Sequence, residues 1–282
     1  MSKRLMTLIL VGSLLQAGVA GADVEKKETI RKTVAVDREG TVIVDNIWGS
    51  ITVESHPGDE VEMVARITIR ADSKKHLQRA EDEVWLDITE EDGDVEFYVD
   101  GPFRCHDEGH RGRGSCERHY IVSYDFDLKV PRGASVELYT VNDGEIEVRG
   151  VEGDFDVKNI NGGIEMSGLR GSGRAYALNG DVTLEFDENP SADCRFGSLN
   201  GEVRIYMRRG LSADFHLKTF NGEVFTDFPV DYLPLISSME EEKKGRTTCR
   251  TIHTVSAVRA GNGGPVIELD GFNGDMFILE GS

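Results

Sequence analysis

Apolar and polar residues alternate over most of this 282-residue chain, and a turn that recurs in almost the same letters interrupts the alternation. Three of these segments read ALNGDVTL (177–184), SLNGEVRI (198–205) and GFNGDMFI (271–278). A period of two is typical of β-strands that have one buried and one solvated face. The pattern therefore predicts an all-β protein whose short strands are joined by Asn-Gly corners.

These segments form an internal repeat when they are aligned on the turn asparagine. Residues four and six positions before it are apolar in most copies, and the residue between those two is charged or His. An earlier copy at 41–53 carries Trp48 in the asparagine position. A shared phase over seven copies indicates a repeat protein. The aligned asparagines, which we expect to be structural corner residues, are Asn142, Asn161, Asn179, Asn200, Asn221 and Asn273.

Two architectures fit this repeat. One is a meander of antiparallel hairpins, because Asn-Gly is a strong hairpin signal in which Asn tolerates the left-handed conformation and Gly adopts positive φ. The other is a β-solenoid, resembling a single-stranded β-helix, with coils of about 20 residues. A solenoid requires equivalent residues at fixed offsets, so the pattern favours it, and its stacked asparagine amides could form a ladder by bonding to neighbouring backbone.

The remaining segments complete the predicted domain, which covers residues 23–282. Regular repeats span 134–228, a loop is inserted at 229–250, and a final repeat spans 265–280. One short helix is predicted near residues 73–84, at the edge or cap of the sheet, because Leu77, Ala80 and Val84 share one face. Asp72 or Ser73 would cap its start. Residues 84–99 are predicted to form two strands about an Asp-Gly turn.

The amino terminus has the features of a secretory signal peptide over residues 1–22. Lys3 and Arg4 precede an apolar run over 5–19, and Ala20-Gly21-Ala22 supplies a cleavage site, so the mature chain would begin at Asp23. A membrane anchor is the alternative, but the run is short for a span of about 20 residues. We expect an exported protein without a membrane span in its mature chain, periplasmic or extracellular at the cell surface.

Charge narrows the classes of partner. Because residues 1–22 contain no acidic residue, removal of Lys3 and Arg4 would change the formal charge from −19 to −21. Such an acidic chain is a poor ligand for nucleic acid or for anionic membrane surfaces.

The run from VPRGA (130–134) through the spaced Asn-Gly turns to the closing GFNGDMFI resembles the bacterial putative-adhesin family of β-strand-repeat proteins, a domain of unknown function. The resemblance covers roughly residues 30–280. It implies a β-solenoid-like fold in an exported protein. It brings no catalytic residues, so none is transferred to this chain.

One segment, CHDEGHRGRGSCERH (105–119), concentrates reactive side chains. A disulfide between Cys105 and Cys116 is the favoured interpretation because an exported protein meets an oxidising environment. Cys and His at close spacing also ligate zinc, although this spacing matches no common structural zinc pattern. Neither outcome is the third alternative. Cys194 falls on the inward face, where it would be a free buried thiol or would pair with Cys249.

The prediction of function starts from the repeat, whose residues serve to stack the coils on one another. The favoured hypothesis is a non-enzymatic, adhesin-like binding or scaffold module with an unknown protein or glycan partner at the cell envelope and no cofactor. One alternative is a carbohydrate-active β-helix enzyme, for which Asp125/Asp127 and Asp154/Asp156 would be candidate carboxylate pairs. Another is a metal or redox sensor that uses residues 105–119.

Overall fold

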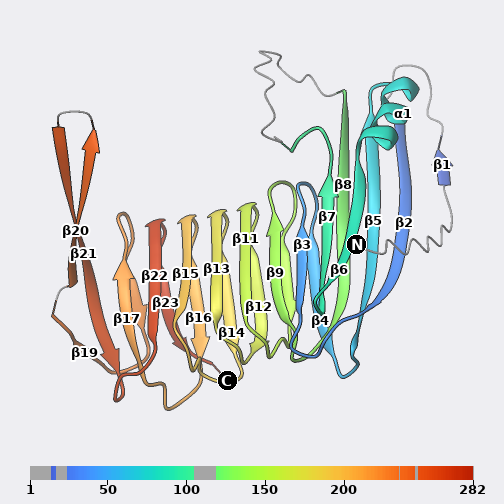
Figure 1. Ribbon diagram of the computed structural model, residues 1–282. Coiled ribbons are helices and arrows are strands. Elements are labelled where there is room, and N and C mark those ends of the chain that lie inside the picture. Colours follow the sequence, from blue (N-terminus) through green and yellow to red (C-terminus); the bar gives the residue numbers. More distant parts are fainter. Residues whose placement is uncertain (1–13, 17–23, 105–118, 235, 245–246, 282) are drawn as a thin grey trace. The chain divides into compact units, whose positions relative to one another are not determined.

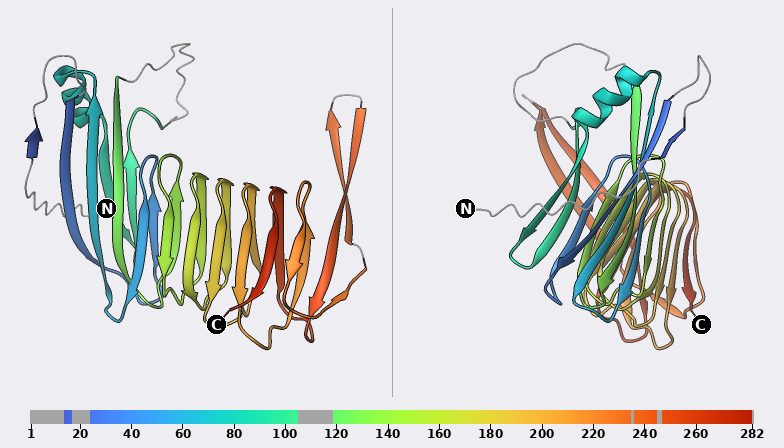
Figure 2. Two further views of the ribbon diagram at one scale, coloured as in Figure 1. Left: turned by 180° about the vertical axis from the view of Figure 1, so that it is seen from behind. Right: turned by 90° about the vertical axis from the view of Figure 1, so that its right-hand side faces the viewer.

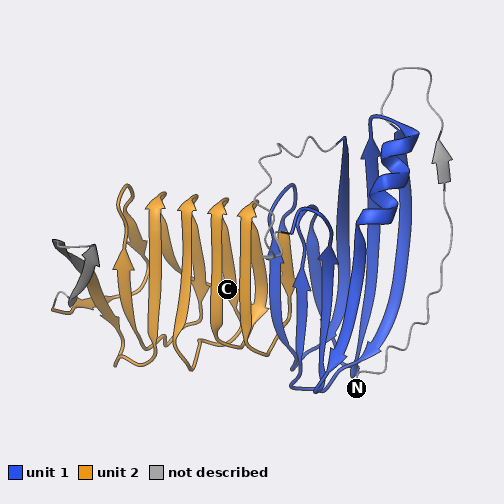
Figure 3. Ribbon diagram, turned by 45° about the horizontal axis from the view of Figure 1, so that its top comes forward, with its two compact units in different colours: residues 1–145 blue, residues 146–282 orange. Residues whose placement is uncertain are grey.

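The structure, a computed structural model, describes residues 14–16, 24–104, 119–234, 236–244 and 247–281. Strands dominate this part of the chain, which contains a single helix, α1 (Figure 1). The predicted signal peptide lies almost wholly outside the described residues, and so do Cys105 and Cys116. The sequence predicts one domain over 23–282, and the chain divides into two compact units, residues 1–145 and 146–282 (Figure 3).

Unit 1 contains two groups of hydrogen-bonded strands. The first has the order β1 (Leu14–Gln16), β2 (Val24–Ala35), β5 (Glu60–Ala71), β8 (Tyr120–Pro131) and β4 (Ile51–His56). The second has the order β9 (Ser135–Thr140), β3 (Thr41–Asp45), β7 (Asp94–Asp100) and β6 (Trp85–Glu91). The pairs β4–β8, β3–β7 and β3–β9 are parallel, and the other pairs are antiparallel.

Local signals in unit 1 were read correctly from the sequence. Helix α1 spans Lys74–Glu83, and its N-cap Ser73 accepts a hydrogen bond from the His76 amide at 3.2 Å. Leu77 and Ala80 are buried, which fixes the face that packs on the strands. Strands β6 and β7 flank a turn in which Asp92 and Gly93 both have positive φ, as an Asp-Gly hairpin requires.

Unit 2 contains two further groups of hydrogen-bonded strands. Figures 1 and 2 show its strands side by side in a row. One has the order β10 (Ile146–Arg149), β12 (Ile164–Leu169), β14 (Val182–Phe186), β16 (Val203–Met207), β23 (Met276–Glu280) and β18 (Val224–Thr226). The other has the order β11 (Phe155–Asn161), β13 (Gly173–Asn179), β15 (Cys194–Asn200), β22 (Val266–Asn273), β17 (Ala213–Lys218), β21 (Thr247–Ala260) and β19 (Val230–Tyr232).

Repeats that are neighbours in space in unit 2 pair in parallel and in the register that the alignment predicts. Val157 lies opposite Ala175, and Ala175 lies opposite Phe196. The neighbouring strands β10, β12, β14, β16, β23 and β18 are also parallel throughout. An Asn-Gly corner therefore joins strands of different groups, and the alternative of antiparallel hairpins is wrong for these repeats.

The spatial order of the repeats differs from their order in the sequence. Strand β22 of the final repeat lies between β15 and β17 and pairs with both (Figure 1). Strand β23 likewise pairs with β16 on one side and with β18 on the other. The repeat that ends the chain is thus inserted between two earlier ones, whereas the sequence predicts simple succession.

The core of unit 2 lies between its two groups of strands. Phe155 and Phe196 from one group contact Phe186 from the other, with ring centroids 6.0–6.4 Å apart. The residue four positions before the turn asparagine is fully buried in four repeats, as Val157, Ala175, Phe196 and Leu269. Leu217, at the same position in the repeat that lies last in the parallel series, is only half-buried.

Residues 229–250 are not a loop. They contain β19 and β20 (Ile236–Lys244), and β20 pairs antiparallel with β21 in the register Glu242 opposite Cys249. The run that follows the charged stretch at 240–246 contains several Thr and Val residues, which have high strand propensity, and it forms β21.

Candidate functional sites

The turn asparagines of unit 2 form a continuous hydrogen-bonded ladder. Each side-chain amide donates to the carbonyl oxygen of the next asparagine at 2.8–2.9 Å, and the bonds join Asn221 to Asn273, Asn273 to Asn200, Asn200 to Asn179 and Asn179 to Asn161. The bonds run between side chains and not to neighbouring backbone. In unit 1, Trp48 and Asn142 face each other across an isolated parallel bridge, as the alignment predicts.

Glycine follows these asparagines because the corners stack closely. A Cβ on Gly180 would lie 2.2 Å from the carbonyl oxygen of Gly162, and one on Gly201 would lie 2.2 Å from that of Gly180. The ladder asparagines themselves have negative φ, as do Gly180 and Gly201. The sequence argument from left-handed turn geometry is thus wrong for Gly180 and Gly201, where close approach of backbone replaces it. Gly274, which follows Asn273, does have a positive φ of 147° and also lies close to the backbone of Gly201.

A stripe of apolar side chains runs beside the ladder on the surface of unit 2. We define the corner stripe as the residues that directly precede the ladder asparagines, in spatial order Ile160, Leu178, Leu199, Phe272 and Phe220. Ile160 is 37% exposed, Phe272 43% and Phe220 73%, while Leu178 and Leu199 are half-buried. Repetition in register makes this surface continuous.

Two phenylalanine pairs occur at the repeat that holds the end of the stripe. The rings of Phe220 and Phe272 stack at 4.9 Å with an interplanar angle of 1°. Phe225 and Phe277 stack at 5.2 Å in the other group of strands. The guanidinium of Arg204 lies 5.2 Å from the centroid of the Phe277 ring. Only the first pair belongs to the corner stripe.

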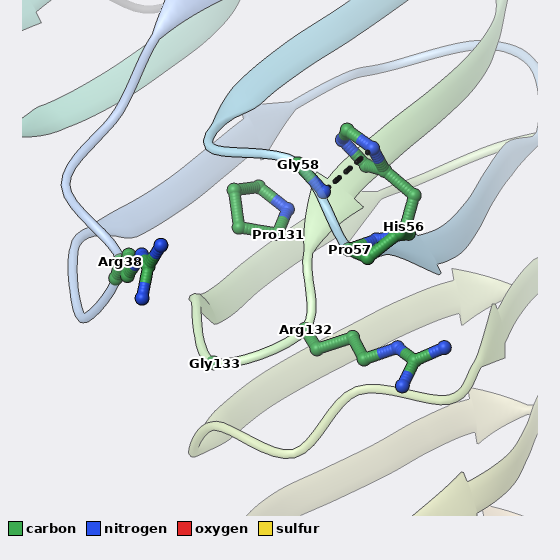
Figure 4. A pocket seen from close by; sticks show the side chains of 7 residues that line it. All are labelled: Arg38, His56, Pro57, Gly58, Pro131, Arg132 and Gly133. Carbon is green, nitrogen blue, oxygen red and sulfur yellow. Dashed lines mark hydrogen bonds between the residues drawn. The ribbon is translucent and has the colours of Figure 1, made fainter.

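Unit 1 has a basic pocket of about 300 Å³ where three loops meet (Figure 4). Its lining comes from Arg38, from His56–Gly58 at the end of β4, and from Pro131–Gly133 at the end of β8. The Gly58 amide donates to His56 Nδ1 at 3.2 Å, so the imidazole is held against its loop. Arg38 and Arg132 give the lining of this pocket two positive charges.

A cluster of one carboxylate and two imidazoles lies at the start of α1. Asp72 Oδ1 contacts His76 Nδ1, and Asp72 Oδ2 lies 2.8 Å from His119 Nδ1. The two imidazole rings stack, with centroids 4.5 Å apart and an interplanar angle of 11°. The hydrogen bond from His76 is the main cause that lowers the pKa of Asp72, and Ser73 and the nearby His119 lower it further.

The strand pairing explains how these distant residues meet. Ala71 at the end of β5 lies opposite Tyr120 at the start of β8, and the pairing continues with the Asp72 amide donating to the His119 carbonyl at 3.1 Å. His76 follows one helical turn later. Sequence reasoning named Asp72 as a cap and His119 as part of the 105–119 segment, but it lacked the β5–β8 pairing that joins them.

Cys194 does not pair with Cys249, which was the alternative that the sequence raised. Cys194 is a free, buried thiol, and burial raises its pKa above the ordinary value, which disfavours the reactive thiolate. Its sulfur donates to the carbonyl of Ala192 at 3.5 Å. Pairing of Cys105 with Cys116 stays a prediction.

The acidic pairs named as glycosidase candidates have local partners. Asp125 accepts hydrogen bonds at 3.0 Å from the amide and hydroxyl of Ser50, and Asp127 forms an ion pair with Arg66. Asp154 accepts a hydrogen bond from the Ser172 amide at 3.1 Å. Asp156 forms an ion pair with Lys158. These contacts favour a structural role, in which the carboxylates stabilise the strands and corners through hydrogen bonds and ion pairs.

Helix α1, the one helix in the described ranges, is too short and too polar to cross a bilayer.

No protein-family model matches this sequence, and no curated protein matches it. Among solved structures, the chain is similar to a "putative cell adhesion protein" from Clostridium sporogenes at 11% identity, covering 90% of this chain and 100% of that one, with a TM-score of 0.39. It is also similar to a "putative adhesin" from Bacteroides fragilis at 9% identity, covering 90% and 97%, with a TM-score of 0.37.

A third similar structure is a "putative lipid binding protein" from Parabacteroides distasonis, at 10% identity over 91% of this chain and 97% of that one, with a TM-score of 0.21. Two of these three names are of the adhesin kind that the sequence resemblance implies.

Proposed function

We propose that this protein is an exported, non-enzymatic, adhesin-like module that binds a polymer of the cell envelope along the corner stripe. In this proposal the repeats form a β-solenoid, and residues 23–282 belong to one such domain. The parallel, in-register pairing of neighbouring repeats in unit 2 supports the solenoid. Export rests on the signal-peptide pattern of residues 1–22.

The single observation that carries the binding role is the exposed, continuous corner stripe. Core packing and the asparagine ladder account for the neighbouring repeat positions, but neither requires Phe220 to be apolar at 73% exposure. Contiguous exposed apolar surface with aromatic side chains is typical of interaction sites. Because the stripe repeats with each coil, it suits an elongated partner, a protein or glycan chain that offers the same group at regular intervals.

A binding assay with matched variants tests this role. Labelled mature protein is sedimented with cell envelopes of the producing organism, and the bound fraction is measured against protein concentration. We expect Phe220→Ser/Phe272→Ser to bind at least about tenfold more weakly, since aromatic anchors dominate interface energy. The control, Phe225→Ser/Phe277→Ser, removes the other stacked pair of the same repeats and should bind like the wild type.

Envelopes digested with protease or with a muramidase then identify the partner as protein or glycan. Circular dichroism establishes that both variants are folded. Equal binding by the two variants would contradict the role of the stripe. Amino-terminal sequencing of the protein recovered from the periplasm or medium tests export separately, and we expect it to begin at Asp23.

A further inference from the structure

We propose that Asp72, His76 and His119 bind one divalent transition-metal ion of the zinc class. This inference does not depend on the proposed binding of envelope polymers, which uses unit 2. The three side chains each offer one ligand atom, and these atoms lie within 4.8 Å of one another. They come from three regular positions: the residue after β5, the first turn of α1, and the residue before β8.

The donor atoms lie close enough to hold one metal ion once their side chains reorient. At metal–ligand distances of about 2.0–2.2 Å, tetrahedral geometry separates two donor atoms by about 3.4 Å. His119 Nδ1 now lies 2.8 Å from Asp72 Oδ2, a hydrogen-bond distance. The two imidazole planes are stacked and nearly parallel, so both rings must rotate about their χ angles to direct a nitrogen at one ion, and the Asp72–His119 distance must open by about 0.6 Å. The backbone bond from Asp72 to His119 keeps both residues in place during this change.

The kind of ligand selects the kind of metal. Two imidazole nitrogens and one carboxylate favour zinc and its neighbours in the first transition row over calcium and magnesium, which prefer sets of oxygen ligands. A neutral imidazole can bind a metal ion through the lone pair of Nδ1 when its single proton resides on Nε2. Three protein ligands leave one tetrahedral position for water or for a group of a partner.

Helix capping does not explain the cluster. The side chain of Ser73 already caps α1 by accepting a hydrogen bond from the His76 amide. The Asp72 carboxylate is therefore not needed at the helix terminus, yet both of its oxygens contact an imidazole nitrogen. The exposed fractions of the side chains are 25% for His76, 44% for Asp72 and 47% for His119, so an ion can enter from solvent.

The proposed site uses no sulfur. It is therefore compatible with a disulfide between Cys105 and Cys116, whereas a zinc site built on those two thiols would exclude that disulfide. This difference separates the present proposal from the sensor hypothesis that the sequence raised for residues 105–119.

Zinc titration of the mature, full-length chain tests the proposal. We expect one Zn²⁺ per chain by isothermal titration calorimetry. Removal of even an outer partner of a metal ligand typically costs about 10–100-fold in affinity, so His76→Ala and His119→Ala should each weaken binding at least about tenfold. His216→Ala, which removes an imidazole from unit 2, and Cys105→Ser/Cys116→Ser should both retain wild-type affinity.

X-ray absorption at the zinc edge gives a second measurement that needs no variant. With one equivalent of zinc bound to the wild type, we expect nitrogen and oxygen scatterers with imidazole features and no sulfur. Wild-type affinity in both His76→Ala and His119→Ala would overturn the proposal. So would sulfur ligation of the zinc, or loss of binding in the double cysteine variant alone.

Discussion

Single residues at the corners of unit 2 are constrained by the distance between neighbouring repeats. The asparagines provide a ladder of amides, and the glycines allow backbone to approach within a distance that no Cβ tolerates. The sequence predicted which residues occupy the corners, but it attributed the glycines to positive φ. The error has a physical origin, because the same Asn-Gly dipeptide serves a tight hairpin and a close stack.

Gly180→Ala should destabilise unit 2 markedly. The new methyl group would meet the carbonyl oxygen of Gly162 at 2.2 Å, and the two backbones would have to separate. Overpacking of this kind costs about 1–3 kcal/mol, and we expect the upper end because the neighbour is backbone. Urea denaturation followed by circular dichroism measures the loss. Gly163→Ala is the matched control, since its methyl group would meet only Asp181 O at 3.4 Å; equal losses would contradict the stacking argument.

The cysteines of residues 105–119 give a second prediction at this scale. If Cys105 and Cys116 are paired, the intact mass of the exported protein is lower by two hydrogen atoms than that of the reduced chain. Reduction should lower the melting temperature, because closing a loop of this length contributes on the order of 3 kcal/mol. Mass spectrometry of a tryptic digest would show the linked peptides. Recovery of both Cys105 and Cys116 as free thiols from the oxidising compartment would contradict the pairing.

At the scale of elements, alternation predicted the buried and solvated positions well. Val182, Leu184, Val203 and Ile205 are all buried as the register requires, and α1 has the predicted face and cap. The pattern could not exclude antiparallel hairpins by itself, because alternation has the same period in parallel and antiparallel strands. The direction of pairing follows only from the residues that face each other on neighbouring strands of the structure, such as Glu165 of β12 opposite Thr183 of β14.

The asparagine ladder links these elements, and its contribution should depend on position. Asn200→Ala removes two side-chain hydrogen bonds, one to Asn179 and one from Asn273, whereas Asn221→Ala removes the single bond to Asn273. A net contribution of about 0.5–1.5 kcal/mol per bond, at the lower end for exposed groups, predicts a loss of about 1–2 kcal/mol for the first variant and about half as much for the second. Equal losses in urea denaturation would show that the ladder is not additive.

At the scale of the whole chain, the position of the final repeat could not be predicted. Leu217 and Leu269 occupy the same place in their repeats, so nothing in the pattern ranks one stacking partner above another. The 52-residue interval before Asn273 showed that a segment intervenes, but not that the chain returns to an inner place. The Asp72–His76–His119 cluster was missed for a related reason, since pairing between remote strands brings its members together.

The inserted final repeat gives the last prediction. A chain that ends at Gly264 lacks β22 and β23, so β17 loses its parallel partner and keeps only β21, while β18 loses its partner β23. Unpaired strand groups and an uncovered core favour local unfolding. We therefore expect residues 208–264 to become sensitive to limited proteolysis, with the preceding repeats still protected, as mass spectrometry of the fragments would show.

Strand complementation provides the control for this truncation. A synthetic peptide of residues 262–282, added to the truncated chain, carries both missing strands and can re-form the parallel pairs with β15, β17, β16 and β18. It should restore protection of 208–264, and the same peptide with Leu269→Asp should not, because Leu269 is fully buried. A truncated chain as resistant as the full-length protein would mean that β17 and β18 are held without the final repeat, and that its insertion is not what completes unit 2.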